Sequence, residues 1–308
     1  MLNTLNQYGM AKIRTLGFLL LVFRFTQAAH GRNNEFRGFW VDAFHPGFNN
    51  SKEVSRLVSD VRAIRGNAVL VEIRKRADAY YNSGLEPRAV GVAPGYDPLA
   101  DLIQKAHDTN GGPRIEIHAW MVAYPAWRVE DGQPSQTNHP FRLHPDWLDQ
   151  SVRGANTDGR EYHFDPGHPE VQKHLFKVAM DIASRYDVDG LNLDYLRYPG
   201  KDWGYNPVSV RRFNQRFGQT GQPAVSDTNW MQFRRDQVTG LLRKIYLSAI
   251  ALKPQLKIST ATVAWPPVPK DMADWANRSG AYGYVFQDWR GWIVTNFFDI
   301  VLPTEMAA

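Results

Sequence analysis

The chain has 308 residues, of which 43% are hydrophobic and 22% charged, an ordinary composition for a folded protein of one or two domains. It contains no cysteine, which excludes disulfide bonds, thiolate metal ligands, a cysteine nucleophile and a lipid anchor on cysteine. The net charge of +5 is spread along the chain rather than gathered in one basic block, so the composition does not indicate a nucleic-acid partner.

The N-terminal segment has the order of an export signal. Two basic residues precede an apolar run at 16–23, and Ala28 and Ala29 follow as small residues for cleavage. The run is too short to span a membrane, and we expect no transmembrane segment later in the chain. We therefore expect a signal peptide at residues 1–29 and a secreted or periplasmic protein. The alternative is an N-terminal tail without fixed structure.

Strand-like and helical segments alternate along residues 30–308. We expect strands at 37–44, 67–74, 114–120, within 187–199, at 257–265 and at 298–302. We expect helices at about 50–64, 97–106, 169–186, 207–217, 228–252 and 283–296. Asn50 and Glu53 are spaced as a capping box, and Pro98 and Pro169 open their helices. This alternation predicts a parallel sheet with right-handed crossovers.

The pattern of polar strand residues distinguishes between an open doubly wound sheet and a (β/α) barrel. No glycine-rich dinucleotide fingerprint follows the first strand, which disfavours a nucleotide-binding sheet. Alternation places one polar face on four strands, formed by Trp40 and Asp42, Glu72 and Arg74, Glu116, His118 and Trp120, and Asn192 and Asp194. A polar face opposite an apolar one fits a barrel lumen. We predict an α/β fold, a TIM-type (β/α) barrel over residues 30–308. Because the sixth strand lies at the end of the sequence, we expect the barrel to be incomplete, with about six of its eight strands.

Several short motifs come in a recognisable order. They read FRGFWVD at 36–42, RKRADAY at 74–80, HAW at 118–120, HPDW at 144–147, DPGHP at 165–169 and YDVDGLNLDYLRYP at 186–199. In these segments the chain resembles the glycoside hydrolase-like 10 family, glycosidases of bacterial envelopes with a TIM-barrel fold. It departs from that family at Ala77, where glycine is usual, at Val122, where asparagine is frequent, and at 303–306, which reads PTEM instead of PMNY.

The resemblance implies hydrolysis of glycosidic bonds in a bacterial envelope polysaccharide such as peptidoglycan, by carboxyl groups and without a cofactor. Asp194 is the first catalytic candidate, because it ends an apolar strand and a buried unpaired carboxylate is costly. Asp42 is the second candidate, and Asp78 and Glu305 are alternatives. The departures leave a non-catalytic or degenerate glycan-binding protein as the alternative function.

Other side chains have the chemistry to bind a sugar. The guanidinium groups of Arg74, Arg76 and Arg197 can bind hydroxyls or a carboxylate. The remaining candidates are Asp78, His118, Trp120, Tyr195 and Trp265, the aromatic ones by stacking on pyranose rings. Loop capping is the rival role for Asp78, and core packing the rival role for Trp120 and Tyr195. The histidines at 139, 144, 163 and 168 lack metal-site spacing, so we expect no metal. No oligomeric state is predicted.

Overall fold

The computed structural model describes residues 35–265 and 269–304, and the chain divides into two units, Met1–Arg37 and Gly38–Ala308. The account below concerns the second unit. The predicted signal peptide at 1–29 and the residues Glu305 and Met306 lie outside the described part of the chain. Within that part, no helix combines the length and the apolar character needed to cross a membrane.

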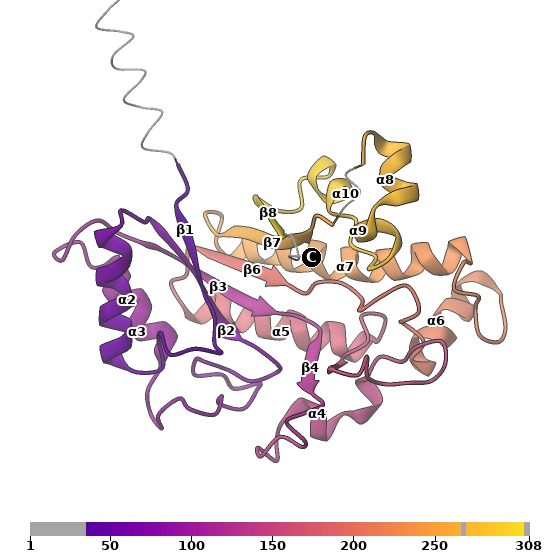
Figure 1. The fold of residues 1–308 in the computed structure, drawn as a ribbon, viewed down its shortest axis with the longest axis horizontal. Helices are drawn as coiled ribbons and strands as arrows, with labels where there is room; N and C mark the ends of the chain where they lie inside the picture. Colours follow the sequence, from indigo (N-terminus) through magenta and orange to yellow (C-terminus); the bar gives the residue numbers. More distant parts are fainter. Residues whose placement is uncertain (1–34, 266–268, 305–308) are drawn as a thin grey trace, which may run out of the picture. The chain divides into compact units, whose positions relative to one another are not determined.

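Six parallel strands form a single sheet whose strand order follows the chain. The strands are β1 Gly38–Val41, β2 Ala68–Arg74, β3 Glu116–Val122, β6 Gly190–Asp194, β7 Lys257–Val263 and β8 Ile300–Thr304, and each pairs with the next (Figure 1). Sequential order is the order of a barrel, whereas the order of a doubly wound sheet reverses at a switch point. The described residues thus form a curled, incomplete TIM-type barrel with six strands, which confirms the predicted fold class.

Helices follow most of the strands. They are α2 Ser51–Ala63, α3 Pro98–His107, α5 Pro169–Arg185, α6 Pro207–Phe217, α7 Thr228–Leu252, α8 Met272–Arg278, α9 Gly280–Gly283 and α10 Trp289–Val294. The bounds of α6 and α7 agree with the predicted ones. At α2 the Asn50 side chain accepts a hydrogen bond from the Glu53 N–H at 3.0 Å, as its spacing predicted. The helix expected at 283–296 is shorter and consists of α10 alone, which begins at Trp289, because Phe286 before it has a left-handed φ of 59°.

The main hydrophobic core lies between the apolar face of the sheet and helices α2, α3, α5 and α7. It joins strand residues such as Val71, Ile117 and Leu191 to helix residues such as Leu102 and Leu241. In Figure 1, α5 and α7 run behind β3 and β6. The alternation of strand side chains leaves the opposite face of the sheet for the lumen.

Gly190 shows how tightly the bottom of the lumen is filled. A Cβ atom at this position would lie 2.2 Å from His118 Nδ1 and 2.9 Å from the Lys257 carbonyl oxygen. His118 is fully buried there, and its Nε2 lies 3.1 Å from Glu116 Oε2. Only glycine leaves room for this imidazole, so His118 fills space at the bottom of the lumen and does not face solvent.

An antiparallel hairpin follows β3 in a stretch whose sequence is mostly polar. It consists of β4 Pro125–Arg128 and β5 Glu161–His163, separated by α4 Pro140–Leu143 and the 3-10 helix η1 Pro145–Trp147. The sequence predicted no strands here, because the two partners are short and far apart along the chain. The hairpin brings Glu161 to the C-terminal end of the sheet.

Candidate active site

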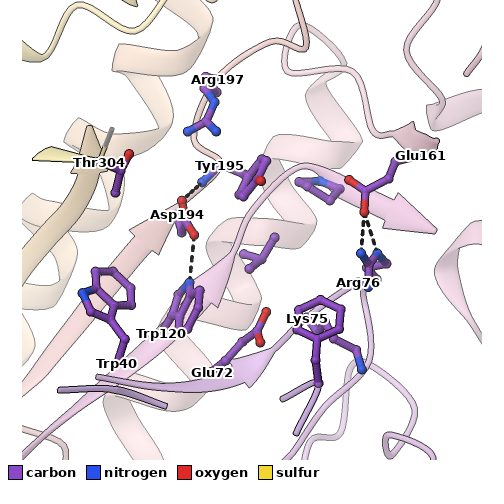
Figure 2. Close-up of a pocket in the computed structure, with 13 residues that line it drawn as sticks. Trp40, Glu72, Lys75, Arg76, Trp120, Glu161, Asp194, Tyr195, Arg197 and Thr304 are labelled. Carbon is purple, nitrogen blue, oxygen red and sulfur yellow. Dashed lines mark hydrogen bonds and ion pairs between the residues drawn. The ribbon is translucent and has the colours of Figure 1, made fainter. Parts of the chain in front are cut away.

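A pocket of about 460 Å3 opens at the C-terminal ends of the strands. We call it the central pocket; its volume is typical of a small-ligand site. Its lining comes from β1, β2, β3, β6, β8 and the hairpin: Trp40, Phe44, Glu72, Lys75, Arg76, Trp120, Val122, Pro125, Glu161, Asp194, Tyr195, Arg197 and Thr304 (Figure 2). Five of the predicted site residues therefore line the same pocket: Arg76, Trp120, Asp194, Tyr195 and Arg197.

Asp194 ends β6 and faces this pocket with its carboxyl group held by two donors. The Tyr195 backbone N–H bonds Oδ1 at 2.6 Å, and the Trp120 indole N–H bonds Oδ2 at 3.1 Å. Burial raises the pKa of Asp194, while the Arg197 guanidinium and both hydrogen bonds oppose that rise. The two donors fix the direction of the carboxyl group and stabilise its ionised form.

Glu72 is the second carboxyl group of the pocket. It lies on β2 opposite Trp120 and is 1% exposed. Its Oε2 accepts one hydrogen bond, from the Ala43 N–H at 2.7 Å. Burial raises its pKa to about 7, opposed by the Ala43 bond and Lys75 and assisted by the charge of Asp194. In Figure 2 the Glu72 and Asp194 side chains lie on either side of the Trp120 ring.

The two carboxyl groups are suited to different protonation states. Asp194 has two hydrogen-bond donors and a nearby guanidinium group, whereas Glu72 has one donor and is 1% exposed, against 8% for Asp194. When two neighbouring carboxyl groups cannot both ionise, the better-solvated one carries the charge. The two donors and the Arg197 guanidinium favour the ionised form of Asp194, whereas burial favours the protonated form of Glu72 and raises its pKa to about 7. Of the two catalytic candidates predicted from the sequence, Asp194 lines this pocket and Asp42 does not. Glu72 was placed on the lumen face but was not chosen, because alternation along a strand gives no measure of depth.

Aromatic rings form the walls of the pocket. Trp40 and Trp120 meet edge to face with ring centroids 4.6 Å apart. Tyr195 has a left-handed φ of 48°, directly after Asp194, and the residue is 39% exposed. The Arg197 guanidinium lies 4.2 Å from the centre of that ring. Exposed rings and a guanidinium beside two carboxyl groups are the elements of a sugar site.

Arg76 is held by a carboxylate from the hairpin. Its Nε and Nη2 donate to Glu161 Oε1 at 2.9 and 2.5 Å, joining the loop after β2 to β5 (Figure 2). Glu161 was not among the site residues predicted from the sequence. The alternation of polar and aromatic residues at 161–164 is the local signal for its strand.

Arg74 does not reach the central pocket, contrary to the expectation from strand parity. The register of β2 against β3 shifts between Glu72 and Arg74, and this irregularity turns Arg74 away from the lumen. Its side chain is fully buried, donates to both oxygens of Glu86 at 2.8–3.0 Å, and also bonds the carbonyls of Val122 and Ala123.

The Arg74 side chain is nevertheless connected to the Asp194 backbone by hydrogen bonds through Ala123. Its Nη1 donates to the Ala123 carbonyl at 2.9 Å, and the Ala123 N–H in turn donates to the Asp194 carbonyl at 2.8 Å. His174 on α5 lies 2.8 Å from the other member of the ion pair, Glu86. Arg74 is thus a positioning residue rather than a sugar ligand.

The other predicted site residues lie elsewhere. His118 is enclosed one layer below the pocket, beside Gly190. Asp42 does not line the pocket; its carboxylate holds His45 at 2.9 Å and the Phe44 N–H at 2.7 Å. Although burial acts in the opposite direction, these bonds lower the pKa of Asp42.

Asp78 and Trp265 belong to two neighbouring pockets. Asp78 accepts the Arg76 backbone N–H at 3.0 Å, the loop-capping role considered for it. Among residues 35–265 and 269–304, no three His, Asp or Glu side chains gather as a metal site would require.

Comparison with known proteins identifies what this chain is similar to. The model of the family Glycosyl hydrolase-like 10 matches residues 35–304. Glycosyl hydrolase YngK from Bacillus subtilis is 29% identical over 262 residues, covering 82% of this chain and 48% of the relative. Glycosyl hydrolase DigH from Escherichia coli K12 is 24% identical over 254 residues, covering 77% and 54%. The chain thus spans about half the length of these curated relatives.

Solved structures show the same fold at low sequence identity. The glycoside hydrolase domain of PgaB (BpsB) from Bordetella bronchiseptica has a TM-score of 0.59 at 12% identity, covering 87% of this chain and 73% of that one. Alpha-L-fucosidase isoenzyme 2 from Paenibacillus thiaminolyticus has a TM-score of 0.57 at 16% identity, covering 73% and 32%. Both likenesses support the barrel assignment.

Proposed function

Because this chain belongs to the glycosyl hydrolase-like 10 family, we propose that it hydrolyses glycosidic bonds of a bacterial envelope polysaccharide, such as peptidoglycan. The observation that carries the proposal is the pair of buried carboxyl groups, Glu72 and Asp194, in one aromatic-walled pocket. Glycoside hydrolysis usually requires one protonated and one ionised carboxyl group on either side of the scissile bond.

We propose a role for each group. Glu72, with a pKa of about 7, donates its proton to the departing glycosidic oxygen. Asp194, held as a carboxylate by Trp120 and Tyr195, acts on the anomeric carbon, directly or through a water molecule. Tyr195 and Trp120 offer faces for the sugar ring, and Arg197 offers donors for its oxygens.

Access to an envelope polymer requires export. We propose that the predicted signal peptide at residues 1–29 directs the protein to a secreted or periplasmic location. The order of a basic start, an apolar run and small residues supports this assignment.

The direct test is the release of reducing ends from purified peptidoglycan by the chain and by Glu72→Gln, Asp194→Asn and Asp42→Asn. We expect the first two variants to lose activity and Asp42→Asn to retain it, because the Asp42 carboxylate lies outside the central pocket. Binding of the polymer without any release of reducing ends would instead support the non-catalytic, glycan-binding alternative.

A further inference from the structure

We propose that Asp149 and Asp165 share one proton between their buried side chains, and that this hydrogen bond holds the loop after β6 against the segment that contains the β4–β5 hairpin. We call residues 195–206 the β6 loop. The β6 loop supplies Tyr195 and Arg197 to the central pocket, and the hairpin supplies Glu161. The two aspartates are thus positioning residues of the site. Their effect on hydrolysis rests on the proposed function, whereas the shared proton itself does not.

Asp149 has the hydrogen bonds of a protonated carboxyl group. It follows η1 and is fully buried. Its Oδ1 accepts the N–H groups of Gln150 and Gly204 at 2.7 and 2.8 Å. Within residues 35–265 and 269–304 no N–H or O–H group donates to its Oδ2, yet the Asp149 side chain is hydrogen bonded to that of Asp165. Two ionised carboxylates have no donor between them, so the pair holds a proton, and the oxygen without a donor is the one to carry it.

Asp165 has the hydrogen bonds of an ionised carboxylate. It opens the DPGHP motif at 165–169 and is also fully buried. Its Oδ1 accepts the Gly167 N–H at 2.5 Å and the Ser209 hydroxyl at 2.8 Å, and its Oδ2 accepts the Asn206 N–H at 3.3 Å. Burial raises the pKa of both aspartates, and the bond between them raises the pKa of Asp149 further while it opposes the rise for Asp165. Both observations place the proton on Asp149 and the negative charge on Asp165.

The surroundings of the pair balance one negative charge. Arg234 on α7 is fully buried, donates to two carbonyl groups of the β6 loop, and acts electrostatically on Asp149. A second buried carboxylate charge would have no such partner and would be costly. The other ionisable residues around the pair are Tyr124 after β3, His163 on β5, His168 before α5, Tyr198 in the β6 loop and Arg212 on α6. Burial raises the pKa of both tyrosines, so their hydroxyls stay protonated, and Arg212 is partly exposed.

The hydrogen bonds of the pair join two walls of the central pocket. The N–H groups of Gly204 and Asn206 belong to the end of the β6 loop, whose start carries Arg197. Asp165 closely follows β5, which carries Glu161. If the shared proton were lost, repulsion between the two carboxylates would separate the β6 loop from the hairpin segment. Pocket residues on both segments would then lose their fixed positions.

Isosteric substitutions distinguish a shared proton from simple packing. Asparagine at 149 keeps an acceptor for Gly204 and donates an amide N–H to Asp165, so we expect Asp149→Asn to resemble the wild type at pH 7. Asparagine at 165 turns an amide N–H towards the donors that Asp165 accepts. We therefore expect Asp165→Asn to speed amide exchange in residues 196–206 about tenfold, measured by mass spectrometry. Asp146→Asn is the matched control, because Asp146 is an exposed carboxylate on the same segment.

Equal exchange in Asp149→Asn and Asp165→Asn would overturn the shared proton. An Asp165→Asn chain that does not fold, beside a folded Asp149→Asn chain that resembles the wild type, would show the same asymmetry and support it.

The pH dependence of unfolding is a second test that needs no activity. The folded chain keeps the shared proton and the unfolded chain releases it, so the free energy of unfolding falls as pH rises. Glu72 gives the same trend up to a pH of about 7, and the comparison is therefore made from pH 7 to pH 9. We expect the urea midpoint of the wild type to fall over this interval more than that of Asp149→Asn. A parallel decline of the two midpoints would overturn the proposal.

Hydrolysis tests the positioning role. On glycan strands prepared from peptidoglycan at pH 7, we expect Asp165→Asn to lower kcat/KM about tenfold more than Asp149→Asn does, because displaced pocket residues no longer orient the substrate. Equal kcat/KM in the two variants, with faster exchange only in Asp165→Asn, would overturn the positioning role. If the wild type hydrolyses nothing, the proposed function fails, and amide exchange and urea unfolding still decide whether the proton is shared.

Discussion

Replacing Glu72 by glutamine tests two properties of this buried carboxyl group: its effect on the free energy of unfolding and its effect on the rate of hydrolysis. Burial raises the pKa of Glu72 from 4.5 to about 7. Between these pH values the unfolded chain releases the proton while the folded chain keeps it, so the free energy of unfolding falls as pH rises. At ~1.4 kcal/mol per pH unit, this interval corresponds to about 3 kcal/mol of stability lost above pH 7.

Glu72→Gln removes that loss, because an amide does not ionise, and it keeps an oxygen to accept the Ala43 N–H. We expect the variant to exceed the wild type by about 3 kcal/mol in free energy of unfolding at pH 8, and by much less at pH 4. Urea unfolding followed by tryptophan fluorescence measures both values. The same variant should lose about 10²–10⁴-fold in hydrolysis, since it has no proton to donate.

Asp42→Asn is the control for the sign of this effect. The pKa of Asp42 is lowered in the fold, so its ionised form adds stability above its unfolded pKa, and that stability is lost as pH falls. The substitution should therefore give no gain at pH 8. A difference between Glu72→Gln and wild type that is the same at pH 4 and pH 8 would refute our account of Glu72.

Three further outcomes are expected, two from the structure and one from the N-terminal sequence. Asp194→Asn should abolish hydrolysis while leaving the circular dichroism spectrum unchanged, and retained turnover would show that another group is the anion. Glu86→Gln should cost about 3–5 kcal/mol in urea unfolding at pH 7, because it leaves Arg74 buried without its partner; a cost below about 1 kcal/mol would contradict the importance of this pair. Mass spectrometry of the exported protein should find an N-terminus near Ala29 or His30, and an intact Met1 or Met10 would refute the signal peptide.

Local rules predicted most of the fold. Helix α5 was predicted from the proline at its start and α2 from its N-cap, since such signals lie within a few residues of each other. Strand parity likewise placed Trp120 and Asp194 on the lumen face. The hairpin β4–β5 escaped prediction because its pairing joins residues more than thirty positions apart, such as Arg128 with Glu161.

The alternation of strand side chains was least informative about the layer in which a lumen residue lies and about shifts in strand register. Alternation assigns a side chain to a face but not to a layer, so His118 and Glu72 were equivalent in the sequence, yet one is packed against Gly190 and the other lines the pocket. The prediction that Arg74 faces the lumen failed for a different reason. An irregularity of register changes the face of every residue beyond it, and no residue type marks its position in advance.

The buried Arg74–Glu86–His174 group bears on how this protein can be altered by mutagenesis. A library that varies one of these positions alone would mostly sample chains with an unmatched interior charge, and the loss of folding would be mistaken for a loss of catalysis. Varying Arg74 and Glu86 together, towards apolar side chains of similar volume, gives neutral pairs a chance to replace the charged one. Recombination between relatives should likewise exchange the β2 loop and α5 as one block.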